Sequence, residues 1–140
     1  MEQVPEIVRV EVLRVVFDES LEAPVVILKE VDGDRILPIW IGHPEATAIV
    51  YALEEIDIER PLTHDLLKTV IETFGGKVEK IVVNKLVSNT FYARIIVRKD
   101  STLFSIDARP SDSIALALRT GAPIYVAEEV MERSSARGNF

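Results

Sequence analysis

Two runs of alternating apolar and polar residues, 77–87 and 90–99, meet at the dipeptide Ser88-Asn89. Side chains of a strand point alternately to its two faces, so each run has the period of a β-strand that is buried on one side. The two runs and the short polar turn between them predict a pair of adjacent strands. A chain that contains this pair must provide further elements to cover its apolar face.

Further strands are predicted wherever alternation or β-branched residues recur, at 7–16, 25–29, 35–41, 102–107 and 124–126. The second and third of these are joined by a turn that contains Asp32-Gly33, a hairpin signal. Three helices are predicted by apolar residues at helical spacing. The first begins near Pro44, the second is capped by Thr63 or Asp65, and the third begins near Pro110 with Ser111 or Asp112 as its cap. The last two end at Gly75-Gly76 and Gly121.

The order of these elements predicts an α+β fold in a single domain. We expect a mixed β-sheet of about six to eight strands packed with about three to four helices. With 140 residues, 48% of them hydrophobic, the chain can bury a full core without disulfides. The domain is predicted to span residues 1–133, and 134–140 are predicted to form a flexible tail. The order of the strands in the sheet cannot be predicted from the pattern.

Composition excludes several classes of protein. The absence of cysteine removes thiol nucleophiles, iron–sulfur clusters and Cys-ligated zinc. No uncharged apolar stretch reaches the roughly 18 residues of a membrane helix, and the acidic start does not resemble a signal peptide. We therefore expect a cytoplasmic protein without a membrane contact. The net charge of −7 argues against a generic nucleic-acid binder.

Residues 77–100 form a basic block in this acidic chain. Strand alternation places Tyr92, Arg94, Ile96 and Arg98 on one face. Arginines beside an aromatic suit a groove for single-stranded nucleic acid. The same face also suits solvent exposure, or a dimer interface through Tyr92 and Ile96. Trp40, in the apolar run 37–41, is predicted to belong to the core.

No nucleophile elbow, phosphate-binding loop, dinucleotide fingerprint or zinc-protease motif is present. Polar residues instead cluster in three places, 42–45, 60–65 and 107–112, each where the chain enters a predicted helix. Helix N-termini present free N–H groups and a positive dipole end, so they favour phosphate.

Each cluster has a catalytic and a structural interpretation. His43 or Glu45 would serve as an acid, a base or a metal ligand, or else Glu45 complements the helix dipole and His43 is solvated. In the second cluster Arg60, His64 and Asp65 would supply a phosphate clamp, a base and a ligand. Alternatively Asp65 caps its helix and His64 packs against a neighbour.

In the third cluster Asp107 and Asp112 bracket Arg109. The two carboxylates could hold a divalent cation while Arg109 grips a phosphate. Alternatively the cluster is a capped helix with an Arg–Asp ion pair. Since the chain has only two histidines, a nuclease built on it would depend mainly on carboxylates, which suit magnesium or manganese.

Taken together, four segments resemble the signature blocks of the bifunctional nuclease domain family. They are LPIWIGHPEA (37–46), RPLTHDLL (60–67), NTFYARI (89–95) and DARPSDSIALALRTGAPI (107–124). Ser113 stands where the family more often has Ala, and Ser88 where an acidic residue is common. The resemblance implies a mixed α+β fold, commonly as a homodimer, and activity on DNA and RNA in some members.

We therefore expect a hydrolase that cleaves phosphodiester bonds of DNA and RNA, with single-stranded nucleic acid as a partner. Its catalytic residues are expected to be His64, Asp65, Asp107, Arg109 and Asp112, its metal ligands Asp107, Asp112 and Glu45, and its substrate-binding residues Arg60, Arg94, Arg98 and Asn89. The alternative is a non-catalytic homodimeric binding or regulatory module on the same fold. We expect His64-Asp65 to converge with Asp107, Arg109 and Asp112 in one pocket, and the stripe Ala46-Ile49-Val50-Leu53 to contribute to a homodimer interface.

Overall fold

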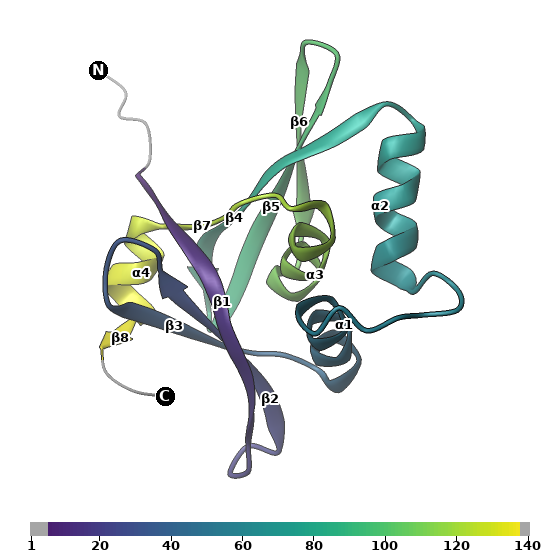
Figure 1. Ribbon diagram of the computed structural model, residues 1–140. Helices are drawn as coiled ribbons and strands as arrows, with labels where there is room; N and C mark the ends of the chain where they lie inside the picture. The colour runs from purple at the N-terminus through teal and green to yellow at the C-terminus, as the bar shows by residue number, and fades with distance from the viewer. Residues whose placement is uncertain (1–5, 138–140) are drawn as a thin grey trace, which may run out of the picture.

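The computed structural model describes residues 6–137, and Figure 1 shows the arrangement of their strands and helices. In chain order these elements are β1 (Ile7–Asp18), β2 (Ala23–Glu30), β3 (Arg35–Trp40), α1 (His43–Leu53), α2 (Thr63–Thr73), β4 (Gly76–Val87), β5 (Thr90–Lys99), β6 (Thr102–Ala108), α3 (Pro110–Thr120), β7 (Ile124–Ala127), α4 (Glu128–Ser134) and β8 (Ala136–Arg137). The eight strands and four helices of the described residues confirm the predicted α+β fold.

All eight strands belong to one sheet with the order β6-β5-β4-β7-β1-β2-β3-β8. The hairpins β1–β2, β2–β3, β4–β5 and β5–β6 pair antiparallel, whereas β7 lies parallel to β4 and antiparallel to β1. The predicted mixed sheet is therefore confirmed. The short strand β7 lies between β4 and β1 and so joins the hairpins β4–β5–β6 to the hairpins β1–β2–β3. Local sequence patterns do not encode this position of β7.

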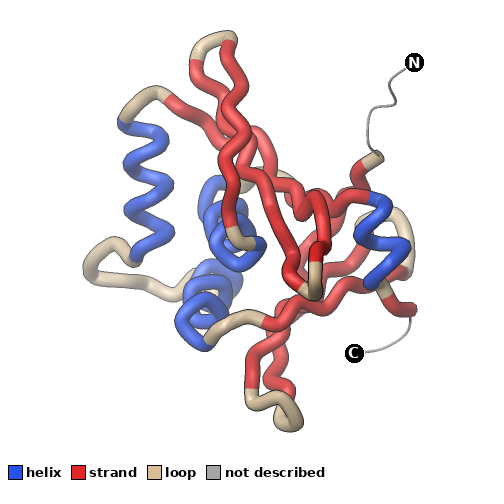
Figure 2. The backbone as a smooth tube through the Cα atoms, turned by 180° about the vertical axis from the view of Figure 1, so that it is seen from behind, coloured by secondary structure: helices blue, strands red, loops and turns tan. Residues whose placement is uncertain are grey.

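Helices α1, α2 and α3 lie together to one side of the sheet, as Figures 1 and 2 show from opposite directions. The main core lies between these three helices and the sheet. It includes the fully buried residues Ile49 from α1, Ile81 from β4 and Leu116 from α3. Ala46 and Ile49 are therefore already buried within a single copy of the chain. The expectation that the Ala46-Ile49-Val50-Leu53 stripe serves a dimer interface is wrong for these two residues.

Pro44 and Pro110 lie in the first turns of α1 and α3, as the sequence predicts, whereas the cap residues of α2 and α3 differ from expectation. Gly42, Leu62 and Arg109 are the N-cap residues of α1, α2 and α3. The caps expected for the last two helices, Thr63 or Asp65 and Ser111 or Asp112, therefore lie inside the first turn. Glycines end elements as expected, since Gly75 and Gly121 both adopt positive φ. Glu45, Asp65 and Asp112 are the third residues of these helices, and each side chain reaches back toward the N-cap residue of its own helix.

Two further features differ from expectation. Trp40 is 46% exposed, because alternation at the end of β3 turns Ile39 into the core and Trp40 to the other face. Helix α4 was not predicted. Part of the expected tail forms β8, whose residues Ala136 and Arg137 pair with β3, while 138–140 lie outside the described residues.

Between residues 6 and 137 no helix is long and apolar enough to cross a membrane. The cytoplasmic location stays a prediction.

Candidate functional site

The N-termini of α1, α2 and α3 surround one groove of about 650 Å³. Its walls include Glu45 from α1, Thr63 and His64 from α2, and Arg109 and Asp112 from the start of α3. The unpaired N–H groups of a helix start carry partial positive charge. Three such ends around one groove make it suitable for an anion even though the chain as a whole is acidic.

His64 and Asp112 form a hydrogen-bonded pair in this groove. The Nε2 atom of His64 lies 2.9 Å from Oδ1 of Asp112. His64 is buried, and it is the one described histidine with a carboxylate partner in hydrogen-bond range. The pair fixes the imidazole ring between α2 and α3.

The charge of Asp112 decides which atom of His64 carries the proton. Burial raises the pKa of this carboxyl, but hydrogen bonds from Arg109 and His64 outweigh burial and hold the pKa below its ordinary value of 3.8. At neutral pH Asp112 is therefore an ionised acceptor, and the hydrogen in the bond must belong to Nε2 of His64. In a neutral imidazole this leaves Nδ1 as a proton acceptor.

Arg109 links the acidic residues of two helices. Its Nε donates to Oδ2 of Asp112 at 2.9 Å, its Nη2 donates to Oδ1 of Asp112 at 3.2 Å, and its Nη1 donates to Oε1 of Glu45 at 2.9 Å. Hydrogen bonds to Asp112 and then Glu45 raise the pKa of Arg109. The Arg109 side chain is nevertheless 63% exposed. Three of the five guanidinium N–H groups are used, which leaves two for a ligand oxygen.

Glu45 is the most confined carboxylate of the groove. Its Oε2 atom is buried and has no hydrogen-bond partner among the described residues. This atom lies against Gly42, where a Cβ would come within 2.6 Å of Oε2. Gly42 therefore provides the space that allows Glu45 to turn toward Arg109.

Asp65 is not part of this groove, although it follows His64 directly. Its Oδ2 accepts a hydrogen bond from the backbone N–H of Leu62, and its Oδ1 accepts one from Arg119, both at 2.9 Å. Adjacent residues of a helix point apart, so only one of the two reaches the groove. The arrangement matches the structural interpretation of Asp65 as a capping residue.

Asp107 lies near the groove without joining the ion-pair network. It is exposed on β6 and borders a neighbouring apolar groove of about 680 Å³ that also contains His64, Arg109 and Asp112. Within residues 6–137 no three Asp, Glu or His side chains are placed to hold one metal ion. Both oxygens of Asp112 and one of Glu45 are bound to Arg109 or His64. This donor arrangement does not fit a divalent cation, and the magnesium or manganese ion stays a prediction.

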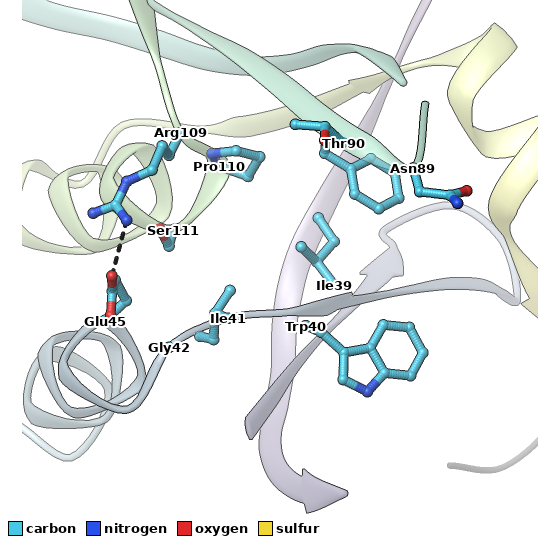
Figure 3. A pocket seen from close by; sticks show the side chains of 11 residues that line it. Ile39, Trp40, Ile41, Gly42, Glu45, Asn89, Thr90, Arg109, Pro110 and Ser111 are labelled. Carbon is cyan, nitrogen blue, oxygen red and sulfur yellow. Dashed lines mark hydrogen bonds and ion pairs between the residues drawn. The ribbon is translucent and has the colours of Figure 1, made fainter. Parts of the chain in front are cut away.

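The expected substrate-binding residues lie in different places. Arg60 is exposed in the loop before α2, and Arg98 forms an ion pair with Glu79. Arg94 lies opposite Asp107 in the β5–β6 register. Asn89, in the β4–β5 turn, borders a second groove that also contains Arg109 (Figure 3).

The direct ion pair between Glu45 and Arg109, 64 positions apart, was not predicted, although Glu45 was expected to share a site with Asp107 and Asp112. Each residue could be recognised as polar at a helix start. Their proximity depends on α1 and α3 beginning side by side, which no local pattern encodes. His43 packs against Phe17 instead, with ring centroids 5.8 Å apart.

Comparisons with known proteins match the sequence to one family. The model of the bifunctional nuclease domain matches residues 26–138. An uncharacterized protein of Mycobacterium tuberculosis is 42% identical over 127 residues, which cover 91% of this chain and 74% of that protein.

Plant relatives carry a functional name. Bifunctional nuclease 1 of Arabidopsis thaliana is 31% identical over 107 residues, 74% of this chain and 33% of that protein. Bifunctional nuclease 2 of Oryza sativa subsp. japonica is 30% identical over 112 residues, 77% of this chain and 34% of that protein. The family match covers the strands and helices that build the groove. The chain belongs to the bifunctional nuclease domain family.

Proposed function

We propose that this chain is a nuclease that hydrolyses phosphodiester bonds of DNA and RNA in the groove between α1, α2 and α3. The observation that carries the proposal is the exposed guanidinium of Arg109, held by Glu45 and Asp112 beside the buried His64. Family membership and the names of the plant relatives support the reaction class.

Arg109 is the proposed phosphate-binding residue. A guanidinium presents two N–H groups in a planar fork that matches two oxygens of a phosphodiester. Glu45 and Asp112 fix its orientation before substrate arrives, so little reorganisation is needed when charge builds on the phosphorus oxygens. The three helix starts add partial positive charge to the same groove.

His64 is the proposed proton-transfer residue. With Nε2–H donated to Asp112, Nδ1 can accept a proton from the attacking water. The water oxygen forms a bond to phosphorus, the bond to the leaving sugar oxygen breaks, and the same proton is returned to that oxygen. Asp112 stabilises the positive charge that His64 carries between these two events.

No step of this mechanism passes through a metal ion, because the carboxylates of the groove are bound to Arg109 and His64. The alternative, a non-catalytic regulatory module, is supported by the same ion pairs, because such pairs are also typical of a structural cluster. The two functions differ in whether His64 is needed for cleavage.

The two histidines of the chain offer a matched test. His64→Gln retains a side chain that can donate to Asp112 but cannot take up a proton at Nδ1, and His43→Gln changes the histidine at the start of α1. We expect the wild-type chain and His43→Gln to cleave single-stranded RNA and DNA, and His64→Gln to be at least about 100-fold slower. Equal rates for both variants would exclude His64 as the proton-transfer residue, and no cleavage by the wild type would favour the regulatory module.

We also propose that the chain forms a homodimer through an apolar surface at α2 and the sheet edge. Leu66 on α2 and Phe74 directly after it are 55% and 72% exposed, and Phe104 and Ile106 on the edge strand β6 are 48% and 44% exposed. Exposed apolar patches and unpaired strand edges are typical of association surfaces. Light scattering should give a mass near twice 15.7 kDa, and Phe74→Glu should return it to one copy.

A further inference from the structure

A second groove adjoins the proposed catalytic groove and shares two residues with it. Its volume is about 400 Å³, within the range of small-ligand pockets. Glu45 and Arg109 border both grooves. Figure 3 shows Arg109 and Glu45 at one end of the second groove, and Trp40 and Asn89 at the other. A ligand that places a phosphate on Arg109 could therefore extend along this groove.

Trp40 gives the far end of the groove an exposed aromatic surface. Its side chain is held in place, because the indole N–H donates to Oδ2 of Asp18 at 2.9 Å. Asp18 is itself fixed by hydrogen bonds from the hydroxyl and backbone N–H of Ser20. Trp40 is thus 46% exposed and yet restrained, which lowers the entropy cost of stacking a ligand on it.

Asn89 provides a polar group beside this aromatic surface. It lies in the two-residue turn between β4 and β5, where Ser88 and Asn89 have φ of 51° and 64°. Two consecutive positive φ angles are typical of the tight two-residue turns that connect hairpin strands. The side-chain amide of Asn89 has both a donor and an acceptor, which can pair with the edge of a nucleobase.

We propose that this groove is a nucleobase subsite, in which Trp40 stacks on an unpaired base of the single-stranded strand whose phosphate Arg109 holds. The inference rests on the proposed nuclease function and adds its substrate class, because a base must leave a duplex before it can enter such a groove. Stacking on an aromatic face tolerates every base. Asn89 adds a preference among bases through its amide.

The chain has a single tryptophan, so its fluorescence reports on Trp40 alone. The probe is a short single-stranded oligoadenylate with phosphorothioate linkages, compared with an abasic oligonucleotide of the same length. We expect the oligoadenylate to quench the fluorescence saturably and the abasic strand and inorganic phosphate to leave it unchanged. Equal quenching by the abasic strand would overturn the proposal.

Substitutions of Trp40 test whether the aromatic ring itself contributes to binding of the oligonucleotide. Measured by anisotropy of a labelled oligoadenylate, Trp40→Ala is expected to weaken binding roughly 5- to 100-fold and Trp40→Phe much less. The matched control is Leu13→Ala, because Leu13 is a similarly exposed apolar residue on β1, at 42%. Wild-type affinity in Trp40→Ala would overturn the proposal, and so would an equal loss in Leu13→Ala.

Asn89→Gly tests the base preference without straining the turn, because Gly accepts positive φ. We expect this variant to bind oligoadenylate, oligocytidylate and oligouridylate with more nearly equal affinity than the wild type does. An unchanged order and spread of the three affinities would remove Asn89 from the subsite.

The subsite and the nuclease function can fail separately. Base-dependent quenching without cleavage would support the subsite and contradict the nuclease. Cleavage by a protein whose Trp40 fluorescence ignores every oligonucleotide would contradict the subsite and leave the nuclease in place.

Discussion

The Nη1 atom of Arg109 lies 2.9 Å from Oε1 of Glu45, which precedes it by 64 residues. This ion pair joins the N-terminal ends of α1 and α3 and lies on the boundary between the two grooves. Because Arg109 also binds Asp112, one guanidinium connects the proposed nucleobase subsite with the His64–Asp112 pair. Arg109 is therefore the residue whose replacement should affect phosphate binding most directly.

Arg109→Lys should lower cleavage of single-stranded RNA and DNA by roughly 10- to 1000-fold, because an ammonium cannot reproduce the planar two-oxygen contact. Thermal stability should change little, since the Arg109 side chain is 63% exposed. The matched control is Arg137→Lys, which alters the exposed Arg137–Asp34 ion pair. Initial rates and melting curves of both variants provide the measurement, and full activity in Arg109→Lys would contradict the assignment.

Gly42→Ala should impair cleavage through Glu45. The added Cβ would lie 2.6 Å from Oε2 of Glu45, so the carboxylate must shift from its present position beside Arg109. The backbone of Gly42, with φ −80° and ψ 163°, is open to alanine, so the fold should be retained. We expect a loss of activity with a nearly unchanged circular dichroism spectrum. Wild-type rates would show that the position of Glu45 does not matter.

The sequence predicted local structure better than the assembly of the site. Hairpin turns such as Ser88-Asn89 and helix stops such as Gly121 depend on the conformations of a few adjacent residues, and these predictions are confirmed. Trp40 was misplaced because an apolar run does not reveal which of its residues ends the strand on the exposed face. Helix α4 and the short strand β8 lack a strong pattern of their own.

Within the site, proximity along the chain was a poor guide. His64 and Asp65 are adjacent, yet only His64 faces the groove, while Asp65 caps α2 and binds Arg119. His64 and Asp112 are 48 residues apart and form a direct hydrogen bond. The expected convergence of His64 with Asp107, Arg109 and Asp112 is present, because these residues border one groove, whereas Asp65 points away from it. The packing of α2 against α3 decides which of the polar residues at the helix starts meet.

Acid should remove the stabilising effect of Asp112. Its folded-state pKa lies below the ordinary value of 3.8, so its contribution is present above that pH and is lost as the pH falls through the lower, folded-state value. At pH 7 we expect Asp112→Asn to be less stable than wild type by about 1 kcal/mol. Denaturant melts from pH 7 downward should show this difference shrinking below pH 3.8. A difference that stays constant or grows on acidification would contradict the ion-pair network.

Chelation tests the role of divalent ions. Both oxygens of Asp112 and Oε1 of Glu45 already face Arg109 or His64, so a metal bound to these carboxylates would compete with that network. We therefore expect cleavage to persist in EDTA, with magnesium or manganese changing the rate only modestly. Activity that disappears in EDTA and returns with one of these ions would contradict the metal-free mechanism.

The central claim is that the His64–Asp112–Arg109 cluster performs the cleavage, and Asp112→Asn tests it most directly. This substitution keeps the size of the side chain while removing the charge that orients His64 and Arg109. The measurement is the initial rate of cleavage of single-stranded RNA and DNA by folded Asp112→Asn, compared with Asp34→Asn, which neutralises the exposed partner of Arg137. The account predicts at least a roughly 100-fold loss in Asp112→Asn and wild-type rates in Asp34→Asn. Wild-type rates in folded Asp112→Asn would contradict it.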